Sequence, residues 1–437
     1  MPYDLDSIGR YQIKGVLGKG AAGIVFKAYD PVLQRTVAIK IPKESDSAIT
    51  NNPKTGQDFY SEAVMGGQLQ HENIVSIYDV GRDNNIDYLV MEYVDGASLK
   101  HHLKHNKPLT IEYVTESIYR LCMALDYIHY NKIVHRDIKP DNVMVNTDND
   151  IVKLMDFSCA SRTSEMASDK TGSAPYMAPE IHDSGNIIGI QSDIFSLGAL
   201  MYELLTGEMA FPGEDALSCV YKVINEEPKS AIELRKELPQ ELNEILIKAM
   251  QKNPDMRFQT VLEFAEALQH YKQKNNTDKN LKAVKEDQYL VFRKDVFFKN
   301  FSPDQVKELM DAGEVQLFND KQMILREGKE NNTFYLVIQG DVQVLKGRTL
   351  IRNLTEGECF GEMSYLTKDK TTASIRANGE VMVWSVSPGL IGDLSCKSQL
   401  GFQNAFIEMI VQRLTNSTEH TARLQKLLYQ ANQTKKK

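Results

Sequence analysis

The stretch from Tyr11 to Lys40 places the tightest limits on the fold, because it contains two β-strand runs joined by glycines and followed by a third run. The first part, "YQIKGVLGKGAAGIVFKAYD", carries Gly18, Gly20 and Gly23, and "RTVAIKI" follows with Lys40 near its end. Glycine allows positive φ and lets the backbone approach a phosphate closely. Ordinary hairpins also contain glycines, so this signal alone is weak. A lysine placed just after such a hairpin can nevertheless reach the α- and β-phosphates of a nucleotide.

The spacing of apolar residues changes along the chain and divides it into regions. Strand-like runs continue in "IVSIYDVG" and "IDYLVMEYV", whereas from Ser98 to about Tyr271 apolar residues recur at i, i+3 and i+4. Residues 272–288 are polar and charged, which is typical of a linker or an exposed helix. After them, "TFYLVIQGDVQVL" and "EVMVWSVS" alternate apolar and polar residues. We therefore expect an α+β multidomain chain with a β-rich lobe, an α-rich lobe and a second β-rich domain.

Composition limits the class of protein. The 437 residues are 42% hydrophobic and 25% charged, which fits two or three soluble domains. The net charge of -8 argues against a nucleic-acid-binding protein, which needs a basic surface. Five scattered cysteines without metal-ligand spacing indicate a reducing compartment. The sequence shows neither a signal-peptide core nor an apolar run of the ~20 residues needed to span a bilayer, so we expect a cytoplasmic protein without a membrane partner.

Two acidic motifs supply candidate catalytic groups. In "HRDIKPDN", Asp137 would orient a substrate hydroxyl and accept its proton, and Asn142 would hold a metal ion. Lys139 lies between them, where it would neutralise charge on the transferred group. In "KLMDFS", Asp156 would be the other metal ligand, and such hard oxygen ligands suit Mg²⁺. Each acid alone is best explained as a solvated surface carboxylate, but together with Lys40 they predict phosphoryl transfer.

The order of these motifs carries a resemblance. The glycine loop, "VAIK", "HRDIKPDN", a "DFG"-like triplet, "APE" at Ala178 to Glu180 and "SDIFSLG" around Asp193 follow one another within residues 11–271. This region resembles a eukaryotic-type (Hanks-type) serine/threonine protein kinase domain, and the single-chain arrangement suggests a bacterial one. The resemblance implies a bilobal fold, ATP with Mg²⁺ (or Mn²⁺ in its place), and protein substrates. The "KPDN" segment is similar to the Ser/Thr-directed form of the loop.

The resemblance also assigns further roles. It implies that Glu62 pairs with Lys40, because Glu44 is too close to Lys40 and Glu72 lies past the helix. Arg257 is expected to form a buried ion pair with Glu180. Asp193 would brace the catalytic loop, Met91 would be the gatekeeper, and Glu92 to Val94 would form the adenine hinge. The implied ATP contacts are Leu17, Gly18, Lys19, Gly20, Ala21, Ala22, Gly23, Ile24, Val25, Ala38, Lys40, Glu92 and Val94.

Two departures from the kinase pattern stand out. Ser158 replaces the glycine of "DFG", which should restrict the backbone at positive φ, although a tolerated small residue is the favoured explanation. Gly66 and Gly67 lie inside the Glu62 helix, where each costs roughly 0.5 to 1 kcal/mol relative to alanine. Gly66 stands where relatives place a bulky residue. Either the helix is loose and Gly66→Leu raises basal activity, or neighbours such as Met65 fill the gap.

The segment between Asp156 and Glu180 is rich in hydroxyl groups. Thr163 and Thr171 are the candidate phosphorylation sites, because a phosphate there could pair with Arg136 and order the segment. Ser173 matches the substrate-facing threonine of the family, so an architectural role is favoured for it.

Residues from about 291 to 415 resemble a cyclic-nucleotide-binding domain, a small β-roll flanked by helices. The resemblance rests on "FYLVIQGDVQVL", "GECFGEMSYL" and "TTASI", and it places Gly361 and Glu362 beside phosphate and ribose. The phosphate-binding arginine of the family falls on Thr371, followed by Thr372. Losing a charged donor to a desolvated phosphate should weaken binding. Lys370 could substitute only if the loop shifts, and Arg376 is expected to face solvent.

Three interpretations of this module stay open. It binds cAMP or cGMP through other contacts, it binds another ligand or serves as a docking domain, or it is a structural vestige. A final helix with Phe406, Ile410 and Leu414 is expected to pack on its own roll, with homodimerisation as the alternative. The predicted boundaries are 8–271 for the kinase domain, 272–290 for a linker, 291–415 for the module, and 416–437 for the tail. The contrasting hypothesis is a non-enzymatic, ATP-binding scaffold.

Overall fold

The computed structural model divides into two compact units, Met1–Thr277 and Asp278–Lys437. It describes residues 5–20, 23–42, 62–103, 108–146, 151–162, 173–182, 189–275, 288–293, 296–367, 369–411 and 415. Among these residues, no helix combines the length and the apolar character that crossing a membrane requires.

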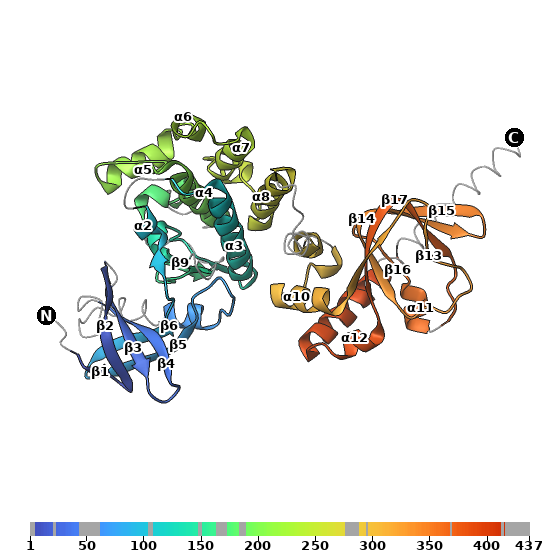
Figure 1. Cartoon of the computed structure of the whole chain (residues 1–437), viewed down its shortest axis with the longest axis horizontal. Helices are drawn as coiled ribbons and strands as arrows, with labels where there is room; N and C mark the ends of the chain where they lie inside the picture. The colour runs from blue at the N-terminus through green and yellow to red at the C-terminus, as the bar shows by residue number, and fades with distance from the viewer. Residues whose placement is uncertain are drawn as a thin grey trace, which may run out of the picture. The chain divides into compact units, whose positions relative to one another are not determined.

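The first unit opens with an antiparallel sheet of six strands in the order β1-β2-β3-β4-β6-β5 (Figure 1). Buried side chains alternate with more exposed ones along most of β3, so one face of the sheet is buried. Tyr11, Phe26, Val37, Ile39 and Val90 form the centre of that core. The strands are β1 Ser7–Ile8, β2 Tyr11–Gly20, β3 Gly23–Asp30, β4 Arg35–Ile41, β5 Ile77–Asp83 and β6 Ile86–Glu92.

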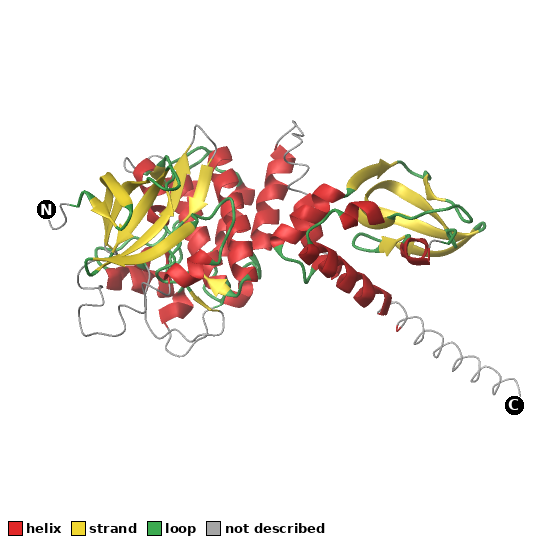
Figure 2. Ribbon diagram, turned by 90° about the horizontal axis from the view of Figure 1, so that it is seen from below, coloured by secondary structure: helices red, strands yellow, loops and turns green. Residues whose placement is uncertain are grey.

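Helices dominate the rest of this unit (Figure 2). The helix α4, Gln191–Thr206, is buried along nearly its whole length, including its carboxylates Asp193 and Glu203. Thr110 caps α3 by accepting a hydrogen bond from the Tyr113 N–H. The other helices are α2 Leu99–His102, α3 Ile111–Tyr130, α5 Ala216–Asn225, α6 Ala231–Leu234, α7 Gln240–Ala249 and α8 Val261–Asn275.

Short strands lie among these helices and carry the loops between them. The strands β7 Ala97–Ser98, β9 Val143–Asn146 and β10 Ile151–Leu154 form one small sheet. The strands β8 Ile133–Val134 and β11 Ser161–Arg162 form another. The segment Pro140–Asn142 is a short 3-10 helix immediately before β9, so the "HRDIKPDN" loop is held between β8 and β9.

The second unit is a rolled antiparallel sheet with the path β12-β17-β14-β15, to which β13 and β16 add (Figure 1). The long strands β14 Phe334–Lys346 and β17 Ser374–Val386 pair along most of their length. The remaining strands are β12 Glu314–Phe318, β13 Met323–Leu325, β15 Thr349–Leu354 and β16 Cys359–Phe360. The helices are α10 Pro303–Ala312, α11 Glu362–Thr367 and α12 Pro388–Gly392, and residues 288–293 and 396–411 are also helical.

An aromatic cluster joins the flanking helices to the roll. Phe406, which is 4% exposed, lies 5.4 Å from Phe334 and 5.3 Å from Tyr365 between ring centroids. Phe406 therefore packs on its own roll as expected, whereas Leu414 lies outside the described residues. The cluster, called the aromatic cluster below, consists of Phe292, Phe297, Phe298, Phe301, Phe334, Tyr365, Trp384, Phe402 and Phe406.

The α+β fold class is confirmed: a β-rich region precedes a helical one, and a second β-rich unit follows. The predicted linker, 272–290, begins in helix, because α8 continues to Asn275. Residues 416–437 lie outside the described residues.

Candidate active site and ligand pocket

Lys40 lies at the centre of a buried charge cluster. It is on β4, and its Nζ is 2.9 and 3.0 Å from the two carboxylate oxygens of Glu62. The same Nζ lies 2.9 Å from Oδ1 of Asp156. Glu62 belongs to a helical segment, residues 62–67, and Glu44 lies outside the described residues. The structure thus brings together three residues that are up to 116 positions apart in the sequence.

The protonation states follow from burial and from the sharing of one ammonium by two carboxylates. Burial alone would lower the pKa of Lys40, but the charges of Asp156 and Glu62 outweigh it and raise that pKa. Burial would raise the pKa of Asp156, but Lys40 and the Ser158 N–H hold it well below its usual range. Burial dominates at Glu62 and raises its pKa to about 7. Lys40 is therefore a fixed positive charge in this cluster.

Asp137 has two carboxylate oxygens in different surroundings. Its Oδ2 accepts hydrogen bonds from Lys139 Nζ at 2.6 Å and from Asn142 Nδ2 at 2.9 Å. Its Oδ1 is buried and has no hydrogen-bond partner among the residues that the structure describes. Lys139 also donates to the Ser173 hydroxyl at 2.8 Å. A buried acceptor without a donor is costly unless another molecule supplies one.

Asp193 holds the loop that carries Asp137. This fully buried carboxylate accepts the backbone N–H groups of His135 at 2.9 Å and Arg136 at 2.8 Å. It also lies 2.8 Å from His129 Nε2. Burial would raise the pKa of Asp193, but these partners lower it, so the carboxylate stays charged. Arg136 is held at φ +69°, a conformation that non-glycine residues rarely adopt and that the surroundings must enforce.

The glycine hairpin frames the space beside Lys40. Strand pairing places Gly20 opposite Gly23 and Val25 opposite Lys40, so the hairpin lies next to the charge cluster. Gly23 has φ +137°, and a Cβ there would overlap the carbonyl oxygen of Ile41. Leu17, Gly18, Lys19, Gly20, Ile24 and Val25 are placed along the hairpin, whereas Ala21 and Ala22 lie outside the described residues.

The predicted hinge follows β6. Ala38 on β4 pairs with Met91, the predicted gatekeeper, and is 6% exposed. The Glu92 N–H donates to the Ser76 carbonyl at 2.8 Å, and its carboxylate pairs with Lys153 at 3.0 Å. Val94 is buried at 9% exposure. The Glu92 carboxylate is therefore already engaged by Lys153.

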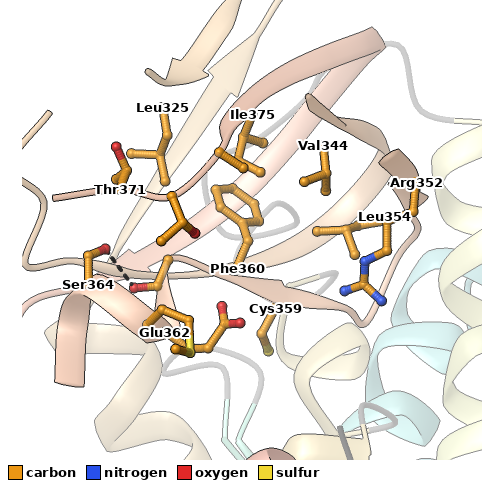
Figure 3. A pocket seen from close by; sticks show the side chains of 14 residues that line it. Leu325, Val344, Arg352, Leu354, Cys359, Phe360, Glu362, Ser364, Thr371 and Ile375 are labelled. Carbon is orange, nitrogen blue, oxygen red and sulfur yellow. Dashed lines mark hydrogen bonds between the residues drawn. The ribbon is translucent and has the colours of Figure 1, made fainter. Parts of the chain in front are cut away.

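The second unit contains a cavity of about 180 Å³ lined by all four predicted pocket residues, Gly361, Glu362, Thr371 and Thr372 (Figure 3). Its walls combine apolar side chains, Leu325, Val344, Leu354, Phe360 and Ile375, with polar and charged ones. The Phe360 ring stacks on Tyr335 with 4.9 Å between centroids. Gly361 has φ +81°, and a Cβ there would lie 2.7 Å from the Thr333 carbonyl oxygen, so only glycine fits.

Thr371 has a structural role that its sequence position did not indicate. Its hydroxyl donates to the Arg326 carbonyl at 2.5 Å, and its backbone N–H donates to the Lys329 carbonyl at 2.9 Å. These bonds fasten the Thr371 loop to the turn after β13, and Thr371 is only 8% exposed. The hydroxyl is thus engaged by the protein itself.

The cation at the cavity is a residue that the sequence argument missed. Lys370 is exposed and does not line the cavity, and Arg376 is held by Gln343 on the neighbouring strand, with N–O distances of 2.6 and 3.1 Å. Arg352 on β15 does line it. The strand pattern contains the signal, because Arg352 is two residues before the buried, cavity-lining Leu354 and so shares its face.

Comparison with known proteins bears on both units. Residues 11–271 match the model of the protein kinase domain, and this match covers more than half of the chain. The chain belongs to the protein kinase family. Residues 315–394 match the model of the cyclic nucleotide-binding domain.

This chain is similar to several bacterial serine/threonine-protein kinases. It is 38% identical over 256 residues to serine/threonine-protein kinase PrkC of Bacillus subtilis, covering 58% of this chain and 39% of that protein. It is 35% identical over 264 residues to serine/threonine-protein kinase PknB of Mycobacterium tuberculosis, covering 58% and 41%. A probable serine/threonine-protein kinase of Clostridium acetobutylicum is 36% identical over 267 residues, covering 60% and 40%. The chain spans about two fifths of the length of these relatives.

The two departures from the kinase pattern have clear structural outcomes. Ser158 is absent from the residues with positive φ, whereas Asp156 has φ +69°, so the serine imposes no strain in this conformation. The space at Gly66 is filled by neighbours, as the second of the two interpretations expected. A Cβ there would overlap Cδ1 of Ile77 and lie 3.3 Å from Phe157, because Ile77 of β5 already fills the space.

The activation segment is only partly described. Thr163 and Thr171 lie outside the described residues and stay predictions. Glu180 at its end forms a bidentate ion pair with Arg257, with both N–O distances at 2.7 Å, as expected. This pair anchors the end of the segment that leads to α4.

Proposed function

We propose that this chain is a serine/threonine protein kinase that transfers the γ-phosphoryl group of ATP to Ser or Thr hydroxyls of proteins. The family membership and the names of the relatives support this activity. The observation that carries the proposal is the buried Oδ1 of Asp137, which has no donor among the described residues while Oδ2 is engaged by Lys139 and Asn142. A substrate hydroxyl would supply the missing donor.

The chain's own groups fit the steps of this transfer. The substrate hydroxyl donates to Oδ1 of Asp137, and its oxygen bonds to the γ-phosphorus as the bond to the β-phosphate oxygen of the leaving ADP breaks. The proton passes to Asp137. Lys139 places its charge between Asp137 and Ser173, where negative charge develops. Lys40, oriented by Glu62, offers its ammonium to the α- and β-phosphates.

Asn142 and Asp156 are suited to hold Mg²⁺ or Mn²⁺. Asn142 turns its Nδ2 towards Asp137, and no described residue donates a hydrogen bond to its Oδ1. Asp156 is a charged carboxylate paired with Lys40. These are the oxygen donors that such ions prefer. Held by these two residues, Mg²⁺ would supply positive charge that offsets the charge of the nucleotide phosphates.

The test is transfer of labelled γ-phosphate from ATP to casein by the full chain. Asp137→Asn should lower kcat by at least about a thousandfold, because the proton acceptor and the positioning of the hydroxyl are both lost. The matched control is Asp255→Asn, an exposed aspartate of the same unit, which should leave the rate unchanged. Equal rates for both variants would sink the proposal. ATP binding without any transfer by the unaltered chain would instead favour the scaffold alternative.

We further propose that the second unit regulates the kinase by binding a small ligand, with a cyclic nucleotide as the first candidate. The match to the cyclic nucleotide-binding domain and the cavity, whose lining is both apolar and polar, support this role. The expected result is a change in phosphotransfer rate on adding cAMP or cGMP to the full chain. Unchanged rates at concentrations shown by calorimetry to saturate the protein would contradict regulation. We retain 8–271 and 291–415 as the proposed domain boundaries.

A further inference from the structure

Arg352 projects from the middle of β15 towards the cavity of the second unit. It pairs in register with Val344 of β14, which also lines the cavity. Figure 3 shows Arg352 and Thr371 on opposite sides of the cavity, with the Phe360 ring between them. A charge at Arg352 therefore acts at the other end of the cavity from residue 371.

The guanidinium of Arg352 retains its donors for a ligand. Within the described part of the chain its one ion pair is with Glu358, at 3.8 Å between Nη1 and Oε1, which is beyond hydrogen-bonding distance. It makes no hydrogen bond to any residue that the structure describes, and its side chain is 49% exposed. The other carboxylate oxygen of Glu358 accepts the Thr355 N–H at 2.9 Å, which keeps this acid in the turn after β15. Arg376, by contrast, is held by Gln343.

The remaining cavity lining offers a ligand little positive charge. Glu362 is its acid, the other walls are apolar or hydroxyl-bearing, and Arg352 is the one cation among the described residues that line the cavity. The Thr371 hydroxyl is already bound to the Arg326 carbonyl. An anionic group placed beside Thr371 would thus lose its hydration without gaining a charged partner. The same group beside Arg352 would gain a planar, bidentate donor.

We propose that Arg352 binds the anionic group of the ligand, and that this ligand is a small organic phosphate whose apolar body lies against Phe360, Leu325 and Ile375. Its phosphate faces β15 instead of the Thr371 loop. This inference rests on the proposed ligand-binding function of the second unit. It adds the class of ligand, the residue that selects it and the end of the cavity at which the charge is held.

The test is calorimetric titration of the full chain with cAMP, cGMP, 5′-AMP, adenosine and guanosine. A non-hydrolysable ATP analogue at saturating concentration occupies the kinase cleft, so that heats report the second unit. At least one phosphate-bearing compound should bind at least ten times more tightly than the two neutral nucleosides. Arg352→Gln should weaken that compound by roughly ten- to a hundredfold, the range expected for a charged hydrogen-bonding partner.

Matched variants separate this effect from general damage. Arg376→Gln removes an arginine of β17, in the same sheet, that does not line the cavity, and binding should change less than twofold. Glu358→Gln should not weaken binding, because this carboxylate competes for the Arg352 guanidinium. Since Arg352 is half exposed, the melting temperature of Arg352→Gln should match that of the unaltered chain.

The possible failures are distinguishable. If a phosphate-bearing compound binds and Arg352→Gln leaves its Kd unchanged, the assignment of Arg352 is overturned while ligand binding stands. If adenosine or guanosine binds as tightly as its phosphate, the anionic class is overturned. If none of the five compounds binds the unaltered chain, the ligand-binding proposal fails, and this inference fails with it.

Discussion

At the scale of single residues, the two carboxylate oxygens of Asp137 lie in different surroundings. One of its oxygens fixes the carboxylate through Lys139 and Asn142, and the other stays buried without a donor. Two other residues, Gly66 and Thr371, occupy positions where the family places larger side chains. Ile77 of β5 fills the space beside Gly66, and the Arg326 carbonyl holds the Thr371 hydroxyl. Each of these contacts leads to a prediction.

Gly66→Ala should lower both stability and kinase activity. The new Cβ would overlap Cδ1 of Ile77, and such overpacking costs about 1–3 kcal/mol. This cost exceeds the roughly 0.5–1 kcal/mol that an alanine adds to the helix. Combining it with Ile77→Ala should recover part of the loss in a double-mutant cycle measured by urea unfolding and phosphotransfer.

Gly67→Ala is the matched control for this pair. A Cβ at Gly67 would meet no atom within 4 Å, so this change should stabilise the helix by about 0.5–1 kcal/mol. If Gly66→Ala behaves like Gly67→Ala, Ile77 does not fill the space. An increase in activity for Gly66→Leu would likewise restore the loose-helix hypothesis.

Thr371→Arg should destabilise the second unit rather than simply add a phosphate contact. Thr371 is buried, and its hydroxyl bond to Arg326 would be lost, at a cost of about 1 kcal/mol or more. Thermal unfolding of the full chain measures the effect. Thr372→Val is the control, because Thr372 is exposed and its side chain fastens no loop. A melting temperature unchanged by Thr371→Arg would show that the loop accommodates the arginine freely.

At the scale of elements, one buried arginine ties three segments of the first unit together. Besides its ion pair to Glu180, Arg257 donates to the carbonyls of Gln191 at 2.8 Å and Gln251 at 2.7 Å. The segment Pro179–His182, the start of α4 and the turn before α8 therefore share one side chain. Lysine has no equivalent of the planar guanidinium of Arg257, which donates several hydrogen bonds in fixed directions.

Arg257→Lys should accordingly lower the free energy of unfolding of the first unit by at least about 2 kcal/mol, although the charge is kept. Urea unfolding monitored by circular dichroism measures this change. Arg82→Lys serves as the control, because Arg82 is 43% exposed and pairs only with Asp87. Its effect should stay below about 1 kcal/mol. Similar losses for both variants would mean that the bidentate geometry is unimportant.

The elements and the catalytic motifs could be predicted from the sequence because their signals are local. The glycine hairpin, the "HRDIKPDN" loop and Asp156 each form a short pattern, and the order of the patterns fixes their roles. The partners of Gly66 and Thr371 could not be predicted in this way. Ile77 reaches Gly66 from β5, and Arg326 reaches Thr371 across 45 positions, so both contacts depend on how separate strands come together. Arg352 is an intermediate case. Strand alternation alone predicts that it shares a face of β15 with Leu354.

At the scale of the whole molecule, regulation must be a coupling between two binding sites, and such coupling is reciprocal. If a phosphate-bearing ligand of the second unit changes the Kd of the ATP analogue by some factor, the analogue must change that ligand's Kd by the same factor. Paired titrations of the full chain measure both factors. In the Arg352→Gln variant, at ligand concentrations too low for binding to this variant, the ligand should no longer change the Kd of the ATP analogue. Unequal factors would contradict a two-site linkage.

The aromatic cluster of the second unit has a spectroscopic consequence. Trp384 is the single tryptophan of the chain, is fully buried on β17, and lies edge-on to Phe292 with 5.3 Å between ring centroids. Tryptophan fluorescence, excited selectively, therefore reports on the second unit and is silent for the kinase unit. Unfolding followed by this emission and by circular dichroism would separate the two units within one intact protein. Trp384 is thus an intrinsic fluorescent probe of the second unit, for which ligand binding is proposed.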